Sequence, residues 1–461
     1  MKKIISTLSA IIIFVSIVFF TACQRNNILN PNKPIILNVW HNYGGQMKNT
    51  MDEMIDEFND TVGLEKGIVL NVTSISGSQT LHEKLIMAAN DDPNAPPLPD
   101  ITTAYPNTAL LLAEKGLLAD IGLQFTQDEL SLYVPRFIDE GRLKDNHLYV
   151  FPVAKSTEVM FVNETIFNRF MRENTVSYED LKTFEGINKT AKIYYDWTDN
   201  LTPDIKNDGK AFIVFDSLFN MAQVGYSQLG DSLIKNNKPD YSSPVFKKIW
   251  DIIFKSSVQG HTAIFDGYGS DLAKTGDVVC SIGSTAGVLF YPPTVTYADN
   301  VVESVEYIIL PYPTLEGGKK VAIQRGSGIC VTKSTKEKEY AAGIFLKWFT
   351  EPEQNLRFIS STGYLPVTKD AFNKIMTEDN KYVSDKNIKK LLTATKLMYS
   401  EYDFYIPPIF DKFDEIQKQY DKRLKQSAME SKKIYYELLD KTEKASAYEE
   451  ATKNSFNNFI K

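Results

Sequence analysis

The chain of 461 residues carries a formal net charge of −7, with 43% hydrophobic and 24% charged residues. This acidic balance argues against nucleic acid as a partner, because binding to phosphates requires clustered positive charge. The length and the ordinary globular composition predict two domains or lobes rather than one.

Residues 1–22 have the layout of a secretory signal peptide, with a basic head, an apolar run over 4–20 and small residues before Cys23. The apolar run is near the lower length limit of a membrane-spanning helix, so an uncleaved anchor is one alternative. The end of this segment resembles a bacterial lipobox, in which the cysteine carries acyl chains such as palmitate. The resemblance implies a lipid on Cys23, a polar tether over 23–33 and an extracytoplasmic location at the cell membrane. An incidental cysteine beside an ordinary signal is the other alternative.

The two remaining cysteines, Cys280 and Cys330, lie in the strand-like segments DVVCSIGS and GSGICVTK. An exported chain can form a disulfide between one such pair. Each position also suits a small buried apolar side chain, so we predict two buried thiols and keep the disulfide as the alternative.

Apolar runs rich in β-forming residues alternate with segments of helical periodicity in the first part of the mature chain. We expect strands at 35–40, 68–75 and 100–104, each followed by a helix. Successive strand–helix units predict a parallel sheet with right-handed crossovers, and ligands of such sheets bind beyond the carboxyl ends of the strands.

Later segments indicate a second lobe. Two extended runs over 148–167 have no helix between them and predict strands that cross from one lobe to the other, and 305–313 predicts another crossing. The last hundred residues have helical periodicity. The expected division is lobe 1 over 34–150, lobe 2 over 151–307, a return to lobe 1 over 308–350, and a helical second part of lobe 2 over 351–461.

Five blocks of sequence, taken in order, resemble the extracellular solute-binding proteins of sugar-type ABC importers (family 1). They are VWHNYGGQMKNTMDEMIDEFN, LPDITTAYPNTALLLAEKGLLADI, FPVAKSTEVMFVNETIF, GSGICVTKSTKEKEYAAGIFLKWFT and STGYLPVTKDAF. The nearest members are those that bind glycerol 3-phosphate, glycerophosphodiesters or sugars. The resemblance implies a two-lobe, periplasmic-binding-protein-like α/β fold, in which each lobe is a sheet flanked by helices and hinge strands join the lobes. It also implies hinge closure around a small sugar or polyol, delivery to ABC permease subunits, a monomer and no cofactor.

Sugars and polyols require aromatic side chains that cover C–H faces and polar groups that bind hydroxyls. Such residues follow the predicted strands, and others match the hinge, glycine-rich and late segments of the family. The candidate ligand-binding residues are His41, Asn42, Tyr43, Ser78, Tyr105, Ser156, Thr157, Asp216, Ser284, Arg325, Gly326 and Tyr364. For several of these residues the alternative is a structural role. Ser156 and Thr157 also suit a turn, and so does Ser284 between its neighbouring glycines.

Two departures from the glycerol-phosphate binders concern the ligand. Pro106 stands where those proteins place an acidic residue after the aromatic one, and the late segment DFYIPPIFDKF lacks their arginine. Either Arg325 substitutes for that arginine at a phosphate, or the ligand is a neutral sugar or oligosaccharide.

We expect no catalysis and no bound metal. The chain contains none of the dinucleotide, P-loop, nucleophile-elbow or zincin motifs, and its four histidines are far apart in sequence and unpaired with cysteine at metal spacing. The alternatives are a lipid-anchored glycoside-acting enzyme that uses two carboxylates, and a surface adhesin without a transport role.

Overall fold

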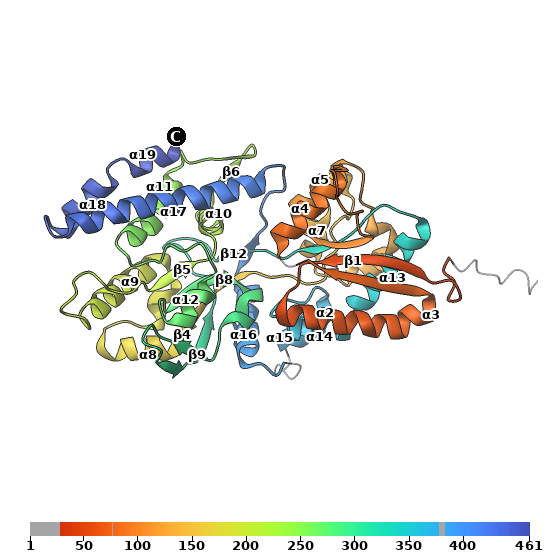
Figure 1. The fold of residues 1–461 in the computed structure, drawn as a ribbon, viewed down its shortest axis with the longest axis horizontal. Coiled ribbons are helices and arrows are strands. Elements are labelled where there is room, and N and C mark those ends of the chain that lie inside the picture. The colour runs from red at the N-terminus through yellow and green to blue at the C-terminus, as the bar shows by residue number, and fades with distance from the viewer. Residues whose placement is uncertain (1–27, 76, 378–382) are drawn as a thin grey trace, which may run out of the picture.

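A computed structural model describes residues 28–75, 77–377 and 383–461, and the expected signal peptide and Cys23 lie outside these ranges. The described chain forms two bodies side by side, each built on a four-stranded sheet with helices on its faces (Figure 1). This arrangement confirms the predicted two-lobe α/β fold. Within the described ranges, no helix combines the length and the hydropathy that crossing a membrane requires.

The first lobe holds the three strand–helix units that the sequence predicts. β1 (Ile35–His41) pairs in parallel with β2 (Ile68–Ser74) and β3 (Ile101–Ala104), and β13 (Gly328–Val331) joins β3 antiparallel, so the strand order is β13-β3-β1-β2. The helices of this lobe are α2 (Gly45–Phe58), α3 (Leu64–Lys66), α4 (Ser78–Ala89), α5 (Pro106–Glu114), α6 (Gln127–Ser131), α7 (Pro135–Gly141), α13 (Lys336–Phe349), α14 (Pro352–Ser360) and α15 (Lys369–Thr377).

The second lobe is built on a mixed sheet of order β11-β4-β8-β5. Its strands are β4 (Glu158–Asn163), β5 (Ile213–Phe215), β8 (Cys280–Ser284) and β11 (Tyr307–Leu310). Two-stranded pairs join β6 (Ile234–Lys235) to β7 (Lys238–Pro239), β9 (Thr294–Thr296) to β10 (Val302–Ser304) and β12 (Val321–Ile323) to β14 (Asp403–Tyr405). The helices are α8 (Glu164–Glu173), α9 (Phe184–Asp199), α10 (Leu218–Gln228), α11 (Pro244–Val258), α12 (Gly269–Thr275), α16 (Lys386–Glu401), α17 (Phe413–Leu438), α18 (Lys444–Thr452) and α19 (Ser455–Ile460).

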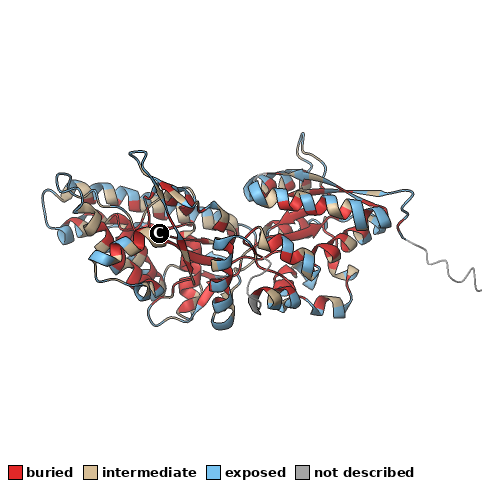
Figure 2. Ribbon diagram, turned by 90° about the horizontal axis from the view of Figure 1, so that it is seen from below, coloured by how far each residue is buried: buried red, intermediate tan, exposed pale blue. Residues whose placement is uncertain are grey.

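Each lobe has its own packed interior, and Figure 2 shows buried residues concentrated along the two sheets. In the first lobe the ring of Phe58 on α2 lies 5.2 Å from Phe345 and 5.3 Å from Trp348 on α13. In the second lobe the Trp250 ring stacks on Phe254 at 4.2 Å. Buried aromatic pairs of this kind stabilise a core beyond the apolar area that they bury.

Two of the segments that cross between the lobes lie against each other. The backbone of Ser156 pairs with that of Arg325, and Phe151 pairs with Ile329 further into the first lobe. The first crossing leads into β4, as the extended runs over 148–167 predict. The second crossing lies between β12 and β13.

This second crossing comes later in the chain than the expected boundary at residue 308. β11 pairs with β4, and β12 with β14, so residues 307–323 run with the second lobe. Conversely, α14 packs in the first lobe, where Phe358 contacts Tyr43 with 5.3 Å between ring centroids, although residues 351–377 were expected in the second lobe. An apolar strand that ends in prolines has the same sequence pattern whether it completes a sheet or leaves it, so the pattern alone does not locate the crossing.

Cys280 on β8 and Cys330 on β13 are both buried and free, and they belong to different sheets. This confirms the prediction of two buried thiols. Burial raises the pKa of the Cys330 thiol to about 12 and also raises that of Cys280.

Candidate functional site

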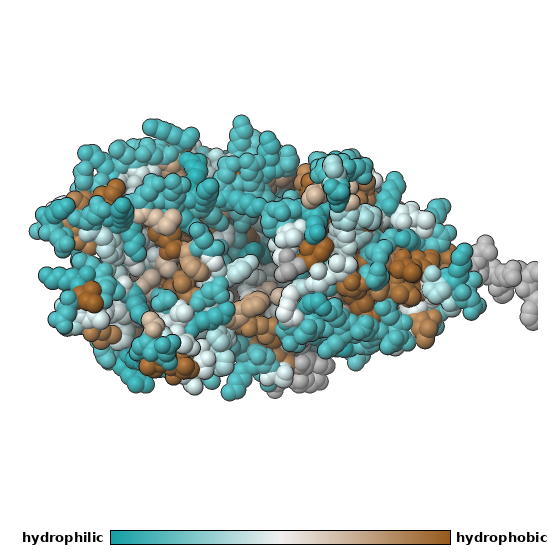
Figure 3. All heavy atoms as spheres, viewed as in Figure 1, coloured by the Kyte–Doolittle hydropathy of each residue, from teal (hydrophilic) through white to brown (hydrophobic). Residues whose placement is uncertain are grey.

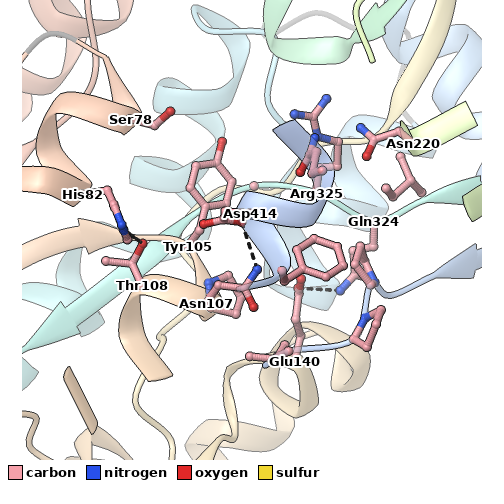
Figure 4. A pocket seen from close by; sticks show the side chains of 18 of the residues that line it. Ser78, His82, Tyr105, Asn107, Thr108, Glu140, Asn220, Gln324, Arg325 and Asp414 are labelled. Atoms are coloured by element: carbon pink, nitrogen blue, oxygen red, sulfur yellow. Dashed lines mark hydrogen bonds between the residues drawn. The ribbon is translucent and has the colours of Figure 1, made fainter. Parts of the chain in front are cut away.

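A cavity of about 340 Å³ lies between the two lobes, and Figure 4 shows side chains from both of them around it. The first lobe contributes the starts of α4 and α5, and the second lobe contributes the start of α17 and the prolines before it. The lining residues are Ser78, Gln79, His82, Tyr105, Pro106, Asn107, Thr108, Glu140, Asn220, Ile323, Gln324, Arg325, Gly326, Pro407, Pro408, Ile409, Phe413, Asp414, Gln417, Lys418 and Asp421.

The first-lobe wall lies beyond the carboxyl ends of β2 and β3, where parallel sheets bind ligands. Ser78 begins α4, and Tyr105 is the N-cap residue of α5, with Pro106 at the first helical position. The Tyr105 side chain is 37% exposed and offers an aromatic face to the cavity. Beside it, Nδ1 of His82 and Oγ1 of Thr108 are 2.8 Å apart in a hydrogen bond that fixes the histidine ring.

The second crossing segment forms the base of the cavity. Gly326 has a φ of 111°, and a Cβ atom there would lie 3.1 Å from the carbonyl oxygen of Ala154, so the position favours glycine. The Arg325 guanidinium donates from Nη1 to Oε1 of Glu158 at 2.8 Å. The same Glu158 oxygen accepts a hydrogen bond from Nδ2 of Asn220 at 2.7 Å, and the Glu158 side chain is only 2% exposed.

A buried ion pair supports this base from the first lobe. Lys155 donates from Nζ to Oε2 of Glu140, and both side chains are buried. The same oxygen accepts a hydrogen bond from Nε2 of Gln324 at 2.6 Å, whereas Oε1 of Gln324 has no hydrogen-bond partner in the described part of the chain. A buried pair whose lone pairs are further satisfied by hydrogen bonds holds its neighbours in one geometry.

The second-lobe wall is one face of α17. Asp414, Gln417 and Asp421 are spaced three and four residues apart, and this spacing places them on one side of the helix. Asp421 accepts a hydrogen bond from the backbone N–H of Phe219 at 2.8 Å, and burial raises its pKa to about 6. Nδ2 of Asn107 in the first lobe donates to Oδ1 of Asp414 at 3.2 Å, which gives a direct contact across the cavity.

The cavity brings together four of the twelve predicted residues: Ser78, Tyr105, Arg325 and Gly326. Asn42 lines a smaller adjoining hollow with Ser78 and Tyr105, and its Oδ1 accepts a hydrogen bond from the Thr103 hydroxyl at 2.9 Å. The other seven do not line the cavity: His41, Tyr43, Ser156, Thr157, Asp216, Ser284 and Tyr364.

Packing in the first lobe explains why three of these seven residues do not line the cavity. His41 is buried, and its Nδ1 accepts a hydrogen bond from the backbone N–H of Tyr43 at 3.2 Å. Burial lowers the pKa of His41 to about 4, so its ring is neutral at pH 7. Tyr43 and Tyr364 both pack around Phe358, with ring centroids 5.3 Å and 6.3 Å from it.

The other four residues are held away from the cavity by hydrogen bonds that involve the backbone. The Thr157 hydroxyl donates to the carbonyl of Ile323 at 2.7 Å, and Ser156 joins Arg325 through backbone hydrogen bonds in both directions. Ser284 caps the turn that follows β8. Asp216 accepts a hydrogen bond from the backbone N–H of Gly269 at 2.7 Å, and burial raises its pKa to about 6.

Sequence reasoning missed the contribution of the C-terminal part of the chain. The signal was present, because Pro407 and Pro408 follow an apolar segment and precede a helix whose first residues include Asp414. Helical periodicity predicts this helix but does not mark the polar face that lines the cavity. Glu140 and Gln324 gave no signal, since each is an isolated polar residue in its segment.

Among the described residues, no group of three or more histidine, cysteine, aspartate or glutamate side chains is placed to hold a metal ion. The polar side chains that line the cavity include hydroxyl, amide and carboxylate groups, which can hydrogen-bond to a ligand.

The family model described as bacterial extracellular solute-binding protein matches residues 53–390. The sn-glycerol-3-phosphate-binding periplasmic proteins UgpB of Shigella flexneri serotype 5b (strain 8401) and Escherichia coli (strain K12) are each 22% identical over 351 residues, covering 72% of this chain and 74% of theirs.

Solved structures are similar over nearly the whole chain. The ABC substrate-binding protein from Listeria monocytogenes in complex with cycloalternan has a TM-score of 0.65 at 17% identity, covering 93% of this chain and 98% of its own. The cyclic alpha-maltosyl-1,6-maltose binding protein from Arthrobacter globiformis has a TM-score of 0.64 at 17% identity, covering 93% of this chain and 99% of its own. UgpB from Mycobacterium tuberculosis in complex with glycerophosphocholine has a TM-score of 0.63 at 14% identity, covering 92% of this chain and 98% of its own. At these identities the likeness shows a common fold.

Proposed function

Since the chain belongs to the family of bacterial extracellular solute-binding proteins, we propose that it is the substrate-binding component of an ABC importer. It captures a carbohydrate or polyol in the cavity between its lobes and delivers it, chemically unchanged, to the membrane permease. The names of its relatives support both sugars and glycerol phosphates as ligand classes.

The observation that carries this proposal is the composition of the cavity wall. Tyr105 offers an aromatic face, and polar side chains from both lobes surround it, so one small ligand can bridge the lobes. Hydroxyl-rich ligands need this combination of an apolar surface and convergent hydrogen-bonding groups. Ser78, Tyr105 and Arg325 are the predicted residues that we propose to contact it, with Asn42 behind them.

We further propose that the lobes close over the ligand by bending at the two crossing segments. These segments lie side by side at Ser156 and Arg325, so a change in their backbone angles would move both lobes at once. Ligand binding shifts the population toward a closed form only to the extent that the closed form binds more tightly. The hydrogen bond between Asn107 and Asp414 is a contact that closure would strengthen.

We also propose that the protein is anchored to the membrane by a lipid. A lipid on Cys23 would hold the protein at the extracytoplasmic face of the membrane and keep it near the permease. The test compares the native chain with Cys23→Ala in the producing cell. We expect incorporation of a palmitate analogue and membrane association in the native chain only, and equal labelling of both would contradict the anchor.

Ligand capture is tested by a melting-temperature screen over neutral sugars, oligosaccharides, glycerol 3-phosphate and glycerophosphodiesters. A ligand raises the melting temperature in proportion to RT ln(1 + [L]/Kd), so a true ligand gives a concentration-dependent shift. Tyr105→Ala should weaken that ligand by about tenfold or more, as expected when a buried aromatic contact is lost. Tyr340→Ala is the matched control, since Tyr340 is 40% exposed and lies on α13 away from the cavity.

Two outcomes would contradict the proposal. One is the absence of any shift over the whole screen, and the other is recovery of a bound compound in altered form after incubation, which would favour the glycoside-acting enzyme.

A further inference from the structure

The cavity has few positive charges for an anion to meet. Among the residues that the structure describes, Arg325 and Lys418 are the only lysine or arginine residues that line it, and three carboxylates line it as well: Glu140, Asp414 and Asp421. Lys418 is exposed and follows Asp414 by four residues on α17, so water and a neighbouring carboxylate both reduce its effect. Arg325 is therefore the cation that decides whether phosphate binds.

Glu158 engages that cation from behind the cavity. The pair joins Nη1 of Arg325 to Oε1 of Glu158 at 2.8 Å, and the exposed fractions of the two side chains are 29% and 2%. Asn220 holds the same Glu158 oxygen at 2.7 Å, so the carboxylate has a fixed position. The guanidinium keeps donors that a neutral hydroxyl can use, but its charge is already balanced by a buried carboxylate.

Two buried amide oxygens lie in residues of the cavity wall, which also carries donors such as the hydroxyls of Ser78 and Tyr105. Oε1 of Gln324 and Oδ1 of Asn107 have no hydrogen-bond partner among the described residues, and Gln324 is only 2% exposed. The orientation of the Gln324 amide is fixed chemically, because its other end faces the Glu140 carboxylate, which can only accept. Both oxygens can only accept hydrogen bonds, so they offer nothing to an ionised phosphate, which also only accepts.

The helix dipole of α17 does not restore a positive site. Helix N-termini attract anions, and α17 begins at the cavity, as α4 and α5 do on the opposite wall. The first turns of α4 and α5 hold no acidic residue, but each helix end carries only about half a unit charge, against the full charges of the carboxylates that line the cavity. Asp414 and Glu415 occupy the first turn of α17 and offset the partial positive charge there.

We propose that Glu158 sets the charge selectivity of the cavity, so that the cavity takes an uncharged, hydroxyl-rich ligand and excludes phosphate-bearing ones. This inference rests on the proposed function and narrows its ligand class. Glu158 does not line the cavity, so it is a positioning residue that acts through Arg325.

The test measures binding of sn-glycerol 3-phosphate and of glycerol, its uncharged counterpart, by titration calorimetry. Glu158→Gln keeps an oxygen for Asn220 but removes the charge that balances Arg325. We expect the wild-type protein to show no preference for the phosphate, and Glu158→Gln to bind it about tenfold more tightly or better, as a newly available charged hydrogen bond predicts. The double variant Glu158→Gln/Arg325→Gln should lose this gain, because the effect passes through the guanidinium.

The inference is overturned if the wild-type protein binds glycerol 3-phosphate more tightly than glycerol, or if folded Glu158→Gln gains no affinity for it. Circular dichroism and the melting temperature establish folding. If Glu158→Gln does not fold, Glu158→Asp, which moves the carboxylate away from Arg325, should show a smaller gain of the same sign, and no gain would overturn the inference too. If no sugar or polyol binds while Glu158→Gln gains affinity for glycerol 3-phosphate, the proposed function fails, but the inference that Glu158 sets the charge selectivity of the cavity stands.

Discussion

The buried histidine at the end of β1 gives a prediction with a calculable size. The sequence suggested that His41 binds ligand, but its ring is fully buried and burial lowers its pKa to about 4. We expect His41→Asn to alter the pH dependence of stability without altering the polar lining of the cavity.

The sign follows from proton linkage. In the unfolded chain the pKa of His41 returns to about 6.5, so between pH 6.5 and pH 4 the unfolded state binds more protons than the folded state. The contribution of His41 to stability is therefore present above its unfolded pKa and is lost as the pH falls toward 4. Linkage between these two pKa values gives a loss of about 2 kcal/mol from pH 7 to pH 5.

The assay is urea unfolding of both proteins at pH 7 and at pH 5. The wild-type protein should lose about 2 kcal/mol more than His41→Asn over this interval. His261 in the second lobe is the matched case, because burial lowers its pKa to about 4 as well, and His261→Asn should reduce the pH dependence in the same direction. Identical pH dependence in wild-type protein and His41→Asn would refute the reasoning.

Two further predictions concern buried groups. Glu140→Gln should destabilise the protein by about 3–5 kcal/mol in chemical unfolding, because it leaves the Lys155 charge buried and unpaired. The control, Glu179→Gln, removes an exposed pair with Lys182 and should cost under about 1 kcal/mol. Equal losses of stability in the two variants would contradict the role of burial. Cys280 and Cys330 should resist a thiol reagent in the native protein and react fully in urea, since burial raises both pKa values; rapid native labelling of either would show that its site is open.

The sequence was sufficient for the architecture of the first lobe because its three strand–helix units are regular. Their strands lie within one residue of the expected bounds, and the positions of Ser78 and Tyr105 followed from the rule for strand ends. The lobe crossing was harder, because β11 ends in prolines like a crossing strand and yet completes the second sheet.

The rest of the cavity could not be predicted because its residues meet only through tertiary structure. Glu140, Gln324 and Asp414 come from three separate segments and carry no motif. The opposite error occurred at His41 and Tyr43, which the strand-end rule selected although both are buried. His41 is the last residue of β1 and continues the buried alternation of Leu37 and Val39, so the strand period already predicts that it points inward. Tyr43 lies past the end of the strand, where this alternation no longer predicts a face.

The central claim is that two lobes close around one small polar ligand. Small-angle X-ray scattering of the free protein and of the protein saturated with the compound that raises its melting temperature tests this most directly. The account predicts a smaller radius of gyration in the saturated sample, and identical scattering of the two samples would contradict it.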